Sequence, residues 1–287
     1  MGSTQLTGPT VVHRAGPARP AVTRAQAMLG ASIVVALGIV AASAYGLLAD
    51  DPYRDLPEAT VLGARGQDVV SLVAALLLVV LALPARLTPP RLLAWLGVLA
   101  YVVYSYAIYL TGVPMNRVFL VYVVIESVAG AALLAGLWRV TAMRWPNVPT
   151  PRLRRGTGWM LVVVAVLFAG LWLSTLLPFA LGGSPPDPEG VGGTPYPVFV
   201  LDLVVVLPAM AAVGVLLLRR HRLGPPLAMV ALVKIVTLFV ALWAGPAYAL
   251  ATGGPVDLGP DAGPSLLLLA ASGWLVTAWW RTLEEET

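Results

Sequence analysis

Long runs of apolar residues, separated by short polar segments, extend over most of the chain. Each run is about as long as the roughly 20 residues that a helix needs to cross a bilayer. One run, 69–84, is shorter, and we expect its helix to include some of the residues beside it. The pattern predicts an all-α integral membrane protein with eight transmembrane helices. The apolar runs are 27–49, 69–84, 92–112, 118–138, 159–177, 198–218, 227–245 and 264–280.

Composition agrees with a membrane location. Hydrophobic residues make up 59% of the 287 residues and charged residues 11%, with a mean hydropathy of +0.85. A soluble domain carries about 25% charged residues. The chain has no cysteine, which excludes disulfides, thiolate metal sites and thiol catalysis. Its two histidines, His13 and His221, lie outside the apolar runs, which excludes a histidine-ligated haem within the membrane. We therefore expect no cofactor and no metal site.

The arginines predict the orientation of the helices. If the N-terminus is cytoplasmic, fourteen of the seventeen arginines fall in cytoplasmic segments, and only Arg54, Arg65 and Arg117 fall outside. Basic residues concentrate on the cytoplasmic side of membrane proteins. The net charge of +4 thus indicates lipid headgroups as the partner and not nucleic acid. We expect a multi-pass protein of the cell membrane with both termini cytoplasmic.

The two halves of the chain share landmarks at a nearly constant offset. These matches predict a parallel duplication of a four-helix unit, an arrangement that recurs in transporters. The predicted segments are a disordered tail (1–26), a first unit (27–138), a basic linker (139–158), a second unit (159–280) and a short tail (281–287). The matching positions are Asp68 with Asp202, Pro89–Pro90 with Pro225–Pro226, and Gly112 with Gly245.

One charge of each sign lies deep within the apolar runs. Lys234 is the only lysine of the chain, and Glu126 lies in the fourth run. At about 1.5 Å per residue, they lie roughly 10 Å and roughly 16 Å from the cytoplasmic ends of their helices. A lysine side chain can span that difference. The sequence therefore predicts a buried Glu126–Lys234 pair, supported by nearby polar groups: Tyr101, Tyr104, Tyr122 and Thr237.

A second polar group is predicted nearer the outer surface. Asp68, Asn116, Arg117 and Asp202 all lie near helix ends that face outward in this topology. Pro208 follows Asp202 and deprives the carbonyl of Val204 of its helical hydrogen bond. We expect an outer polar cluster at this level. Asp202 is predicted to lie too far out to pair with Lys234.

Buried acids and bases within a membrane are typical of proton and substrate pathways. The favoured hypothesis is a transporter or permease for a small solute or protons. The alternatives are a non-catalytic assembly subunit that binds a partner membrane protein, and an intramembrane enzyme. Asp50, Asp51 and Asp55 resemble the acidic first-loop motif of glycosyltransferases that use lipid-linked donors, and their spacing resembles prenyltransferase motifs. A lone lysine in a seventh helix also resembles the retinal attachment site of rhodopsins, but those proteins have seven helices and an external N-terminus.

Overall fold

The computed structural model describes residues 21–50, 52–54, 56–83, 88–145, 150–185, 196–256, 258 and 262–285. This part of the chain is helical and contains no strand. Eight helices are long and apolar enough to cross a membrane, as predicted. The sixth span, Tyr196–Leu218, is assembled from three consecutive helical segments. The elements are α1 (Ala21–Leu48), α2 (Glu58–Ala82), α3 (Pro89–Gly112), α4 (Phe119–Ala142), α5 (Pro151–Ala180), α6 (Tyr196–Leu201), the π-helical turn η1 (Asp202–Val206), α7 (Leu207–Leu218), α8 (Gly224–Thr252) and α9 (Ala262–Glu285).

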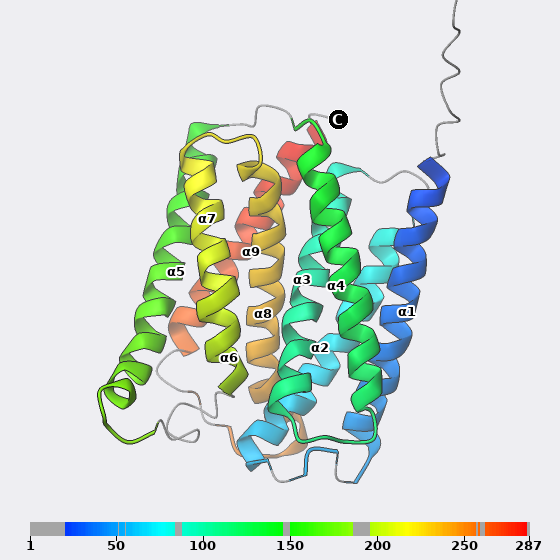
Figure 1. The fold of residues 1–287 in the computed structure, drawn as a ribbon, viewed down its shortest axis with the longest axis vertical. Coiled ribbons are helices and arrows are strands. Elements are labelled where there is room, and N and C mark those ends of the chain that lie inside the picture. Colours follow the sequence, from blue (N-terminus) through cyan, green and yellow to red (C-terminus); the bar gives the residue numbers. More distant parts are fainter. Residues whose placement is uncertain are drawn as a thin grey trace, which may run out of the picture.

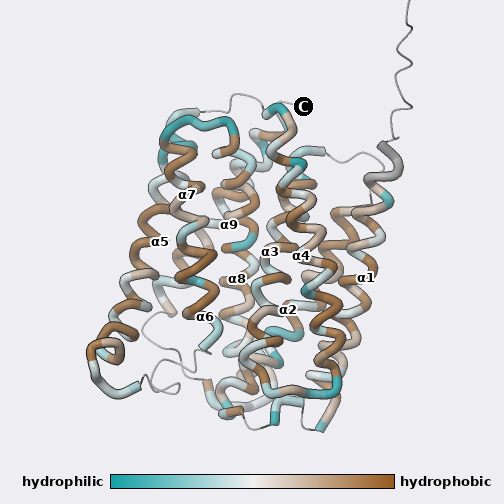
Figure 2. Tube along the Cα trace, viewed as in Figure 1, coloured by the Kyte–Doolittle hydropathy of each residue, from teal (hydrophilic) through white to brown (hydrophobic). Residues whose placement is uncertain are grey.

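The spans form an up-and-down bundle in which α1 begins and α9 ends on the same side (Figure 1). We call this side the terminal end and the opposite side the distal end. Polar residues gather at the two ends, while apolar residues cover the sides of the helices (Figure 2). Large apolar side chains such as Leu37, Leu76, Leu134 and Leu267 are exposed there. These exposed side chains are the surface that a bilayer would cover.

Several helices have proline in their first turn, where its missing N–H would have no helical partner. Examples are Pro89 in α3, Pro151 in α5 and Pro225 in α8. Gly253, in the left-handed conformation with φ 73°, ends α8. Because these signals are local, the sequence could place most helices closely. The predicted bounds differ most at the start of α2, which begins at Glu58, at the start of α5, which begins at Pro151, and at the end of α8, which continues through Pro246 to Thr252.

Two predicted polar segments are partly helical. The tail predicted for residues 1–26 contains the start of α1 at Ala21, and its first twenty residues lie outside the described part of the chain. The linker predicted for 139–158 contains the end of α4 and the first turns of α5. Most of the predicted C-terminal tail, 281–287, continues α9.

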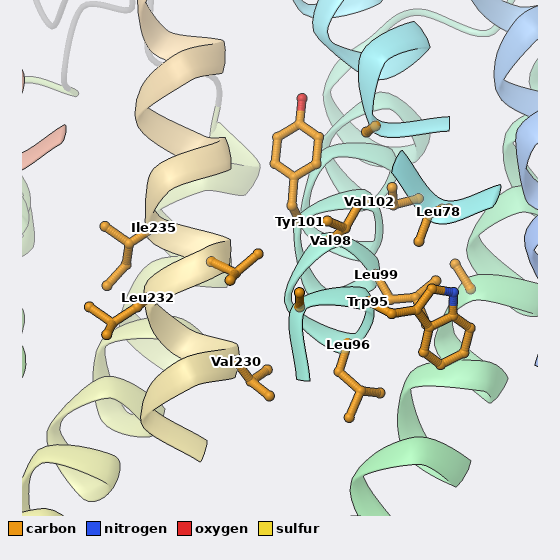
Figure 3. Packing of buried hydrophobic residues seen from close by; sticks show 14 of the residues in the cluster. Leu78, Trp95, Leu96, Val98, Leu99, Tyr101, Val102, Val230, Leu232 and Ile235 are labelled. Carbon is orange, nitrogen blue, oxygen red and sulfur yellow. The ribbon is translucent and has the colours of Figure 1, made fainter. Parts of the chain in front are cut away.

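The core lies around α3, which has the largest buried share of the eight spans. It packs against α2, α4 and α8. Trp95, Leu96 and Leu99 of α3 occupy this core, and Val230 points from α8 toward α3 (Figure 3). A Cβ added at Gly97 of α3 would lie 2.5 Å from the Cβ of Val233, so glycine permits this close approach. Helices α3 and α8, one from each half of the chain, therefore form the centre of the bundle.

Candidate functional site

Lys234 is buried in α8, with 7% of its surface exposed. Its ammonium nitrogen Nζ lies 4.0 Å from the centre of the Tyr104 ring, on α3. A cation over an aromatic face is stabilised by about 0.5 to 2 kcal/mol. Among the described residues, Nζ has no hydrogen-bond acceptor. A buried ammonium normally bonds an acceptor, so this site holds a charge whose hydrogen-bonding capacity is unused.

Asp202 provides the opposite charge. Its carboxylate accepts a hydrogen bond of 3.1 Å from the Tyr104 hydroxyl and one of 2.9 Å from Trp172 Nε1, on α5. It is also the acid whose charge acts on Lys234. Tyr104 thus contacts both charges, the ammonium with its ring and the carboxylate with its hydroxyl. We call Lys234, Tyr104, Asp202 and Trp172 the Lys234 site.

The backbone at Asp202 is locally irregular. Asp202–Val206 forms a π-helical turn, in which the Leu207 N–H donates to the Asp202 carbonyl. Pro208, two residues beyond this turn, has no N–H to donate. Single π-turns occur frequently at functional sites, since one extra residue per turn redirects the side chains around it. Here the first residue of the turn is the buried acid.

Aromatic rings surround the acid. Trp172 contacts Phe199 with ring centres 5.0 Å apart, and it also contacts Phe168, which in turn contacts Phe239 of α8. Asp202 and Lys234 are both only 7% exposed beside these rings. Electrostatic interactions at the Lys234 site are therefore stronger than they would be in water.

The structure does not bring Glu126 and Lys234 together as a hydrogen-bonded pair. Helix α4, which carries Glu126, packs against α3 and α1, whereas α8 packs against the other side of the core through α2, α3, α7 and α9. Helix α3 lies between α4 and α8 (Figure 1), and the Lys234 ammonium has no hydrogen-bond partner among the described residues, Glu126 included. Oε2 of Glu126 has no donor within the described part of the chain. Asp202, predicted to lie too far out, is linked to Lys234 through Tyr104, which donates to Asp202 with its hydroxyl and lies under the ammonium with its ring.

The residues of the predicted outer polar cluster divide in the structure, because Asp68 and Asp202 have separate sets of partners. Asp68 is 2% exposed and accepts hydrogen bonds from the hydroxyls of Tyr53 and Tyr109. Glycine at position 46 of α1 makes room for it, since a Cβ there would overlap the Asp68 carboxylate. We call Asp68, Tyr53 and Tyr109 the Asp68 site.

The other residues predicted for these two groups have different partners in the structure. Asn116 donates to the Tyr122 hydroxyl, and the Tyr122 ring contacts that of Tyr109, which places both at the edge of the Asp68 site. Arg117 is exposed. Tyr101 bonds Gln67 instead of a charged group. The Thr237 hydroxyl donates to carbonyls of its own helix, so it contributes no side-chain contact to Lys234.

Sequence reasoning missed Trp172, Tyr53 and Tyr109 as partners of buried acids. Pro208 was a usable signal for the irregular backbone beside Asp202, but no spacing rule identified the indole nitrogen of another helix. Of the acidic first-loop motif, Asp51 and Asp55 lie outside the described residues. No group of three potential metal ligands occurs within the described ranges. Comparisons of the chain with protein families, with characterised proteins and with solved structures found no match.

Proposed function

We propose that the protein is a permease-like transporter that couples the movement of a small solute to protons at the Lys234 site. One observation carries the proposal: a buried ammonium without a hydrogen-bond acceptor lies over the ring of Tyr104, whose hydroxyl donates to a carboxylate that is held by two donors. A purely structural ion pair gains most when both partners are fully hydrogen-bonded. Ionisable groups that remain unsatisfied within a membrane are typical of proton and substrate pathways.

The arrangement suits a change of protonation. With the proton bound, the ammonium and the Asp202 carboxylate neutralise each other across the Tyr104 ring. Loss of the proton removes the cation from the ring and leaves Asp202 as an uncompensated negative charge. In a buried aromatic environment this change alters the balance of forces between α3, α8 and the π-helical turn that carries Asp202. A protonation step at this site can therefore bias the packing of the helices that hold it.

The position of the site also supports the proposal. Tyr104 belongs to the first half of the chain, while Trp172, Asp202 and Lys234 belong to the second. Transporters built from two repeated units bind their ions and substrates where the units meet. A parallel duplication and a cytoplasmic location for both termini remain part of this proposal. Reporter fusions after Arg155 and Arg222 should locate inside the cell, and fusions after Asp55 and Asp257 outside.

The test is proton movement in liposomes that contain the purified protein and a pH-sensitive dye in the lumen. Gradients of inorganic ions and of small organic solutes are imposed one at a time, with and without a membrane potential. We expect one gradient to drive a change in lumenal pH through the wild-type protein. Lys234→Met and Asp202→Asn should abolish that change.

Glu126→Gln is the matched control, because it neutralises a membrane-buried charge outside the Lys234 site. It should leave the pH change intact. A wild-type protein that moves no protons under any gradient, as expected of a non-catalytic assembly subunit, would contradict the proposal. So would a folded Lys234→Met variant that moves protons as fast as the wild type.

A further inference from the structure

A groove lies between α5 and α9 at the terminal end of the bundle, where α5 begins and α9 ends (Figure 1). The two helices are joined by a buried hydrogen bond of 3.0 Å, which Trp279 Nε1 donates to the Thr157 hydroxyl. The neighbours of these two residues in sequence, Gly156 and Ala278, line the groove. Its volume of about 420 Å³ is in the range of ligand pockets, about 300 to 1,000 Å³. The α5–α9 groove is lined by Thr150, Arg152, Leu153, Gly156, Trp274, Leu275, Ala278 and Thr282.

Polar and apolar lining residues are separated along the helix axes. Thr150 and Arg152 lie at the start of α5, and Thr282 lies near the end of α9, so all three are at the level of the membrane surface. Trp274 lies eight residues before Thr282, or roughly 12 Å further into the membrane. Leucine, alanine and glycine line the part between them. The groove therefore has a polar, cationic mouth and an apolar inner part.

The mouth is suited to an anionic group. Arg152 is exposed, and it is the only charged residue of the lining. A guanidinium binds phosphate through two parallel hydrogen bonds. Thr150 precedes the first residue of α5, and its side chain makes no capping hydrogen bond there. A phosphate at the mouth would thus meet one cation and one hydroxyl donor, with no acid in the lining to repel it.

The inner part is suited to a hydrocarbon chain. A Cβ added at Gly156 would meet no atom within 4 Å, so the chain itself leaves this space open. Trp274 is 65% exposed beside it. Spread over roughly 12 Å, the volume corresponds to a cross-section of about 35 Å², whereas a helix with its side chains is at least about 10 Å wide. The groove is therefore too narrow for a helix of another protein.

We propose that the α5–α9 groove is a specific site for one anionic phospholipid. The phosphate binds Arg152 and Thr150 at the mouth, and an acyl chain lies over Gly156 against Trp274. Basic pockets between membrane helices bind anionic headgroups in this way. Further arginines at the same end of the bundle favour a lipid with net negative charge, among them Arg154, Arg155 and Arg281.

The test counts lipids bound to the full-length protein by native mass spectrometry. The protein is stripped of lipid in detergent and titrated with phosphatidylglycerol or with phosphatidylcholine. The two probes share a phosphate and the same acyl chains, but only phosphatidylglycerol has a net negative charge. We expect the first molecule of phosphatidylglycerol to bind more tightly than the first of phosphatidylcholine. Inorganic phosphate, which has no chains, should not displace it.

Two pairs of variants separate the mouth from the inner part. Arg152→Gln should weaken phosphatidylglycerol binding about fivefold, the contribution of one basic residue near a membrane surface. Arg155→Gln, an exposed neighbour outside the lining, should weaken it clearly less. Gly156→Leu fills the open space and should abolish tight binding of the first lipid. Gly170→Leu is its control, because Gly170 lies on the same helix with equally open surroundings but outside the groove.

Unfolding in SDS verifies the fold of the four variants, whose side chains all lie at the surface. Equal affinity for the two lipids, or equal effects of Arg152→Gln and Arg155→Gln, would overturn the assignment of the mouth. Displacement by inorganic phosphate, or tight binding retained in folded Gly156→Leu, would overturn the assignment of the inner part to an acyl chain.

Discussion

Asp202→Asn should destabilise the protein strongly, because Asp202 is the one charge among the described residues that acts on the buried ammonium. Lys234 is 7% exposed and has no hydrogen-bond acceptor among the described residues. After the substitution only the Tyr104 ring, 4.0 Å away, still stabilises it. Breaking a buried pair in this way costs about 3 to 5 kcal/mol. We expect a loss in that range.

Lys234→Met should cost clearly less, roughly half as much. It leaves a buried carboxylate, but Asp202 retains its two donors, Tyr104 and Trp172. Hydrogen bonds to charged groups contribute about 1.5 to 3 kcal/mol each, so the remaining acid is still largely compensated. Adding Lys234→Met to Asp202→Asn removes the stranded cation. The double variant should therefore be more stable than Asp202→Asn alone by about 2 kcal/mol.

The assay is unfolding by SDS in mixed micelles, followed by tryptophan fluorescence, with the free energy of unfolding compared across the four proteins. Glu126→Gln combined with Lys234→Met is the control pair, and its effects should add, since α3 separates the two residues. Additive effects of the Lys234 and Asp202 substitutions would refute the pairing. A larger loss for Lys234→Met than for Asp202→Asn would refute the argument about hydrogen-bond donors.

Three further predictions concern the packing of α2, Tyr53 of the Asp68 site and the Lys234 side chain. Gly66→Ala should destabilise the protein by about 1 to 3 kcal/mol in the same SDS assay, because its Cβ would press on the backbone at Ala244; Gly63→Ala, with nothing within 4 Å, should be near neutral. Burial raises the pKa of Tyr53, which lies outside the spans, above its value in the unfolded chain. The contribution of Tyr53 to the free energy of unfolding is therefore constant below pH 10 and is lost as pH rises through the folded pKa. Absorbance titration of wild type and of Tyr53→Phe measures by difference the pH at which Tyr53 ionises in the folded protein. In ¹⁵N-lysine-labelled protein, the single Lys234 side-chain resonance should shift on Asp202→Asn and not on Gly63→Ala.

The eight spans could be predicted because the length of an apolar run is a property of the sequence alone. The prediction was poorest for α2, which begins eleven residues before the run 69–84. That first part contains Gln67 and Asp68, whose side chains face α3 and the loop after α1 and not lipid. Polar residues that are satisfied inside a bundle lower the hydropathy of a true span. Hydropathy therefore underestimates helices that carry buried polar sites.

The burial of Lys234 could be predicted, but its partner could not. The rise per residue gives a position along a helix axis, and only that coordinate was available to compare Lys234, Glu126 and Asp202. Which helices are neighbours depends on packing across the bundle, where α3 separates α4 from α8. Main-chain positions alone place Lys234 and Asp202 at depths too different for direct pairing. Tyr104 reaches both, because its ring and its hydroxyl contact different groups.

The π-helical turn at Asp202 holds one residue more than an α-helical turn would. The extra residue could shift to another turn of the span, so that this turn becomes α-helical. In that case α6 would rotate by about 100° and advance by about 1.5 Å relative to α7. Asp202 would then leave the hydroxyl of Tyr104 and the indole of Trp172, and it would carry its charge to a different side of the span. Gain or loss of the single extra residue in this turn would therefore rotate one part of the sixth span against the other, and Asp202, the first residue of the turn, would move with it.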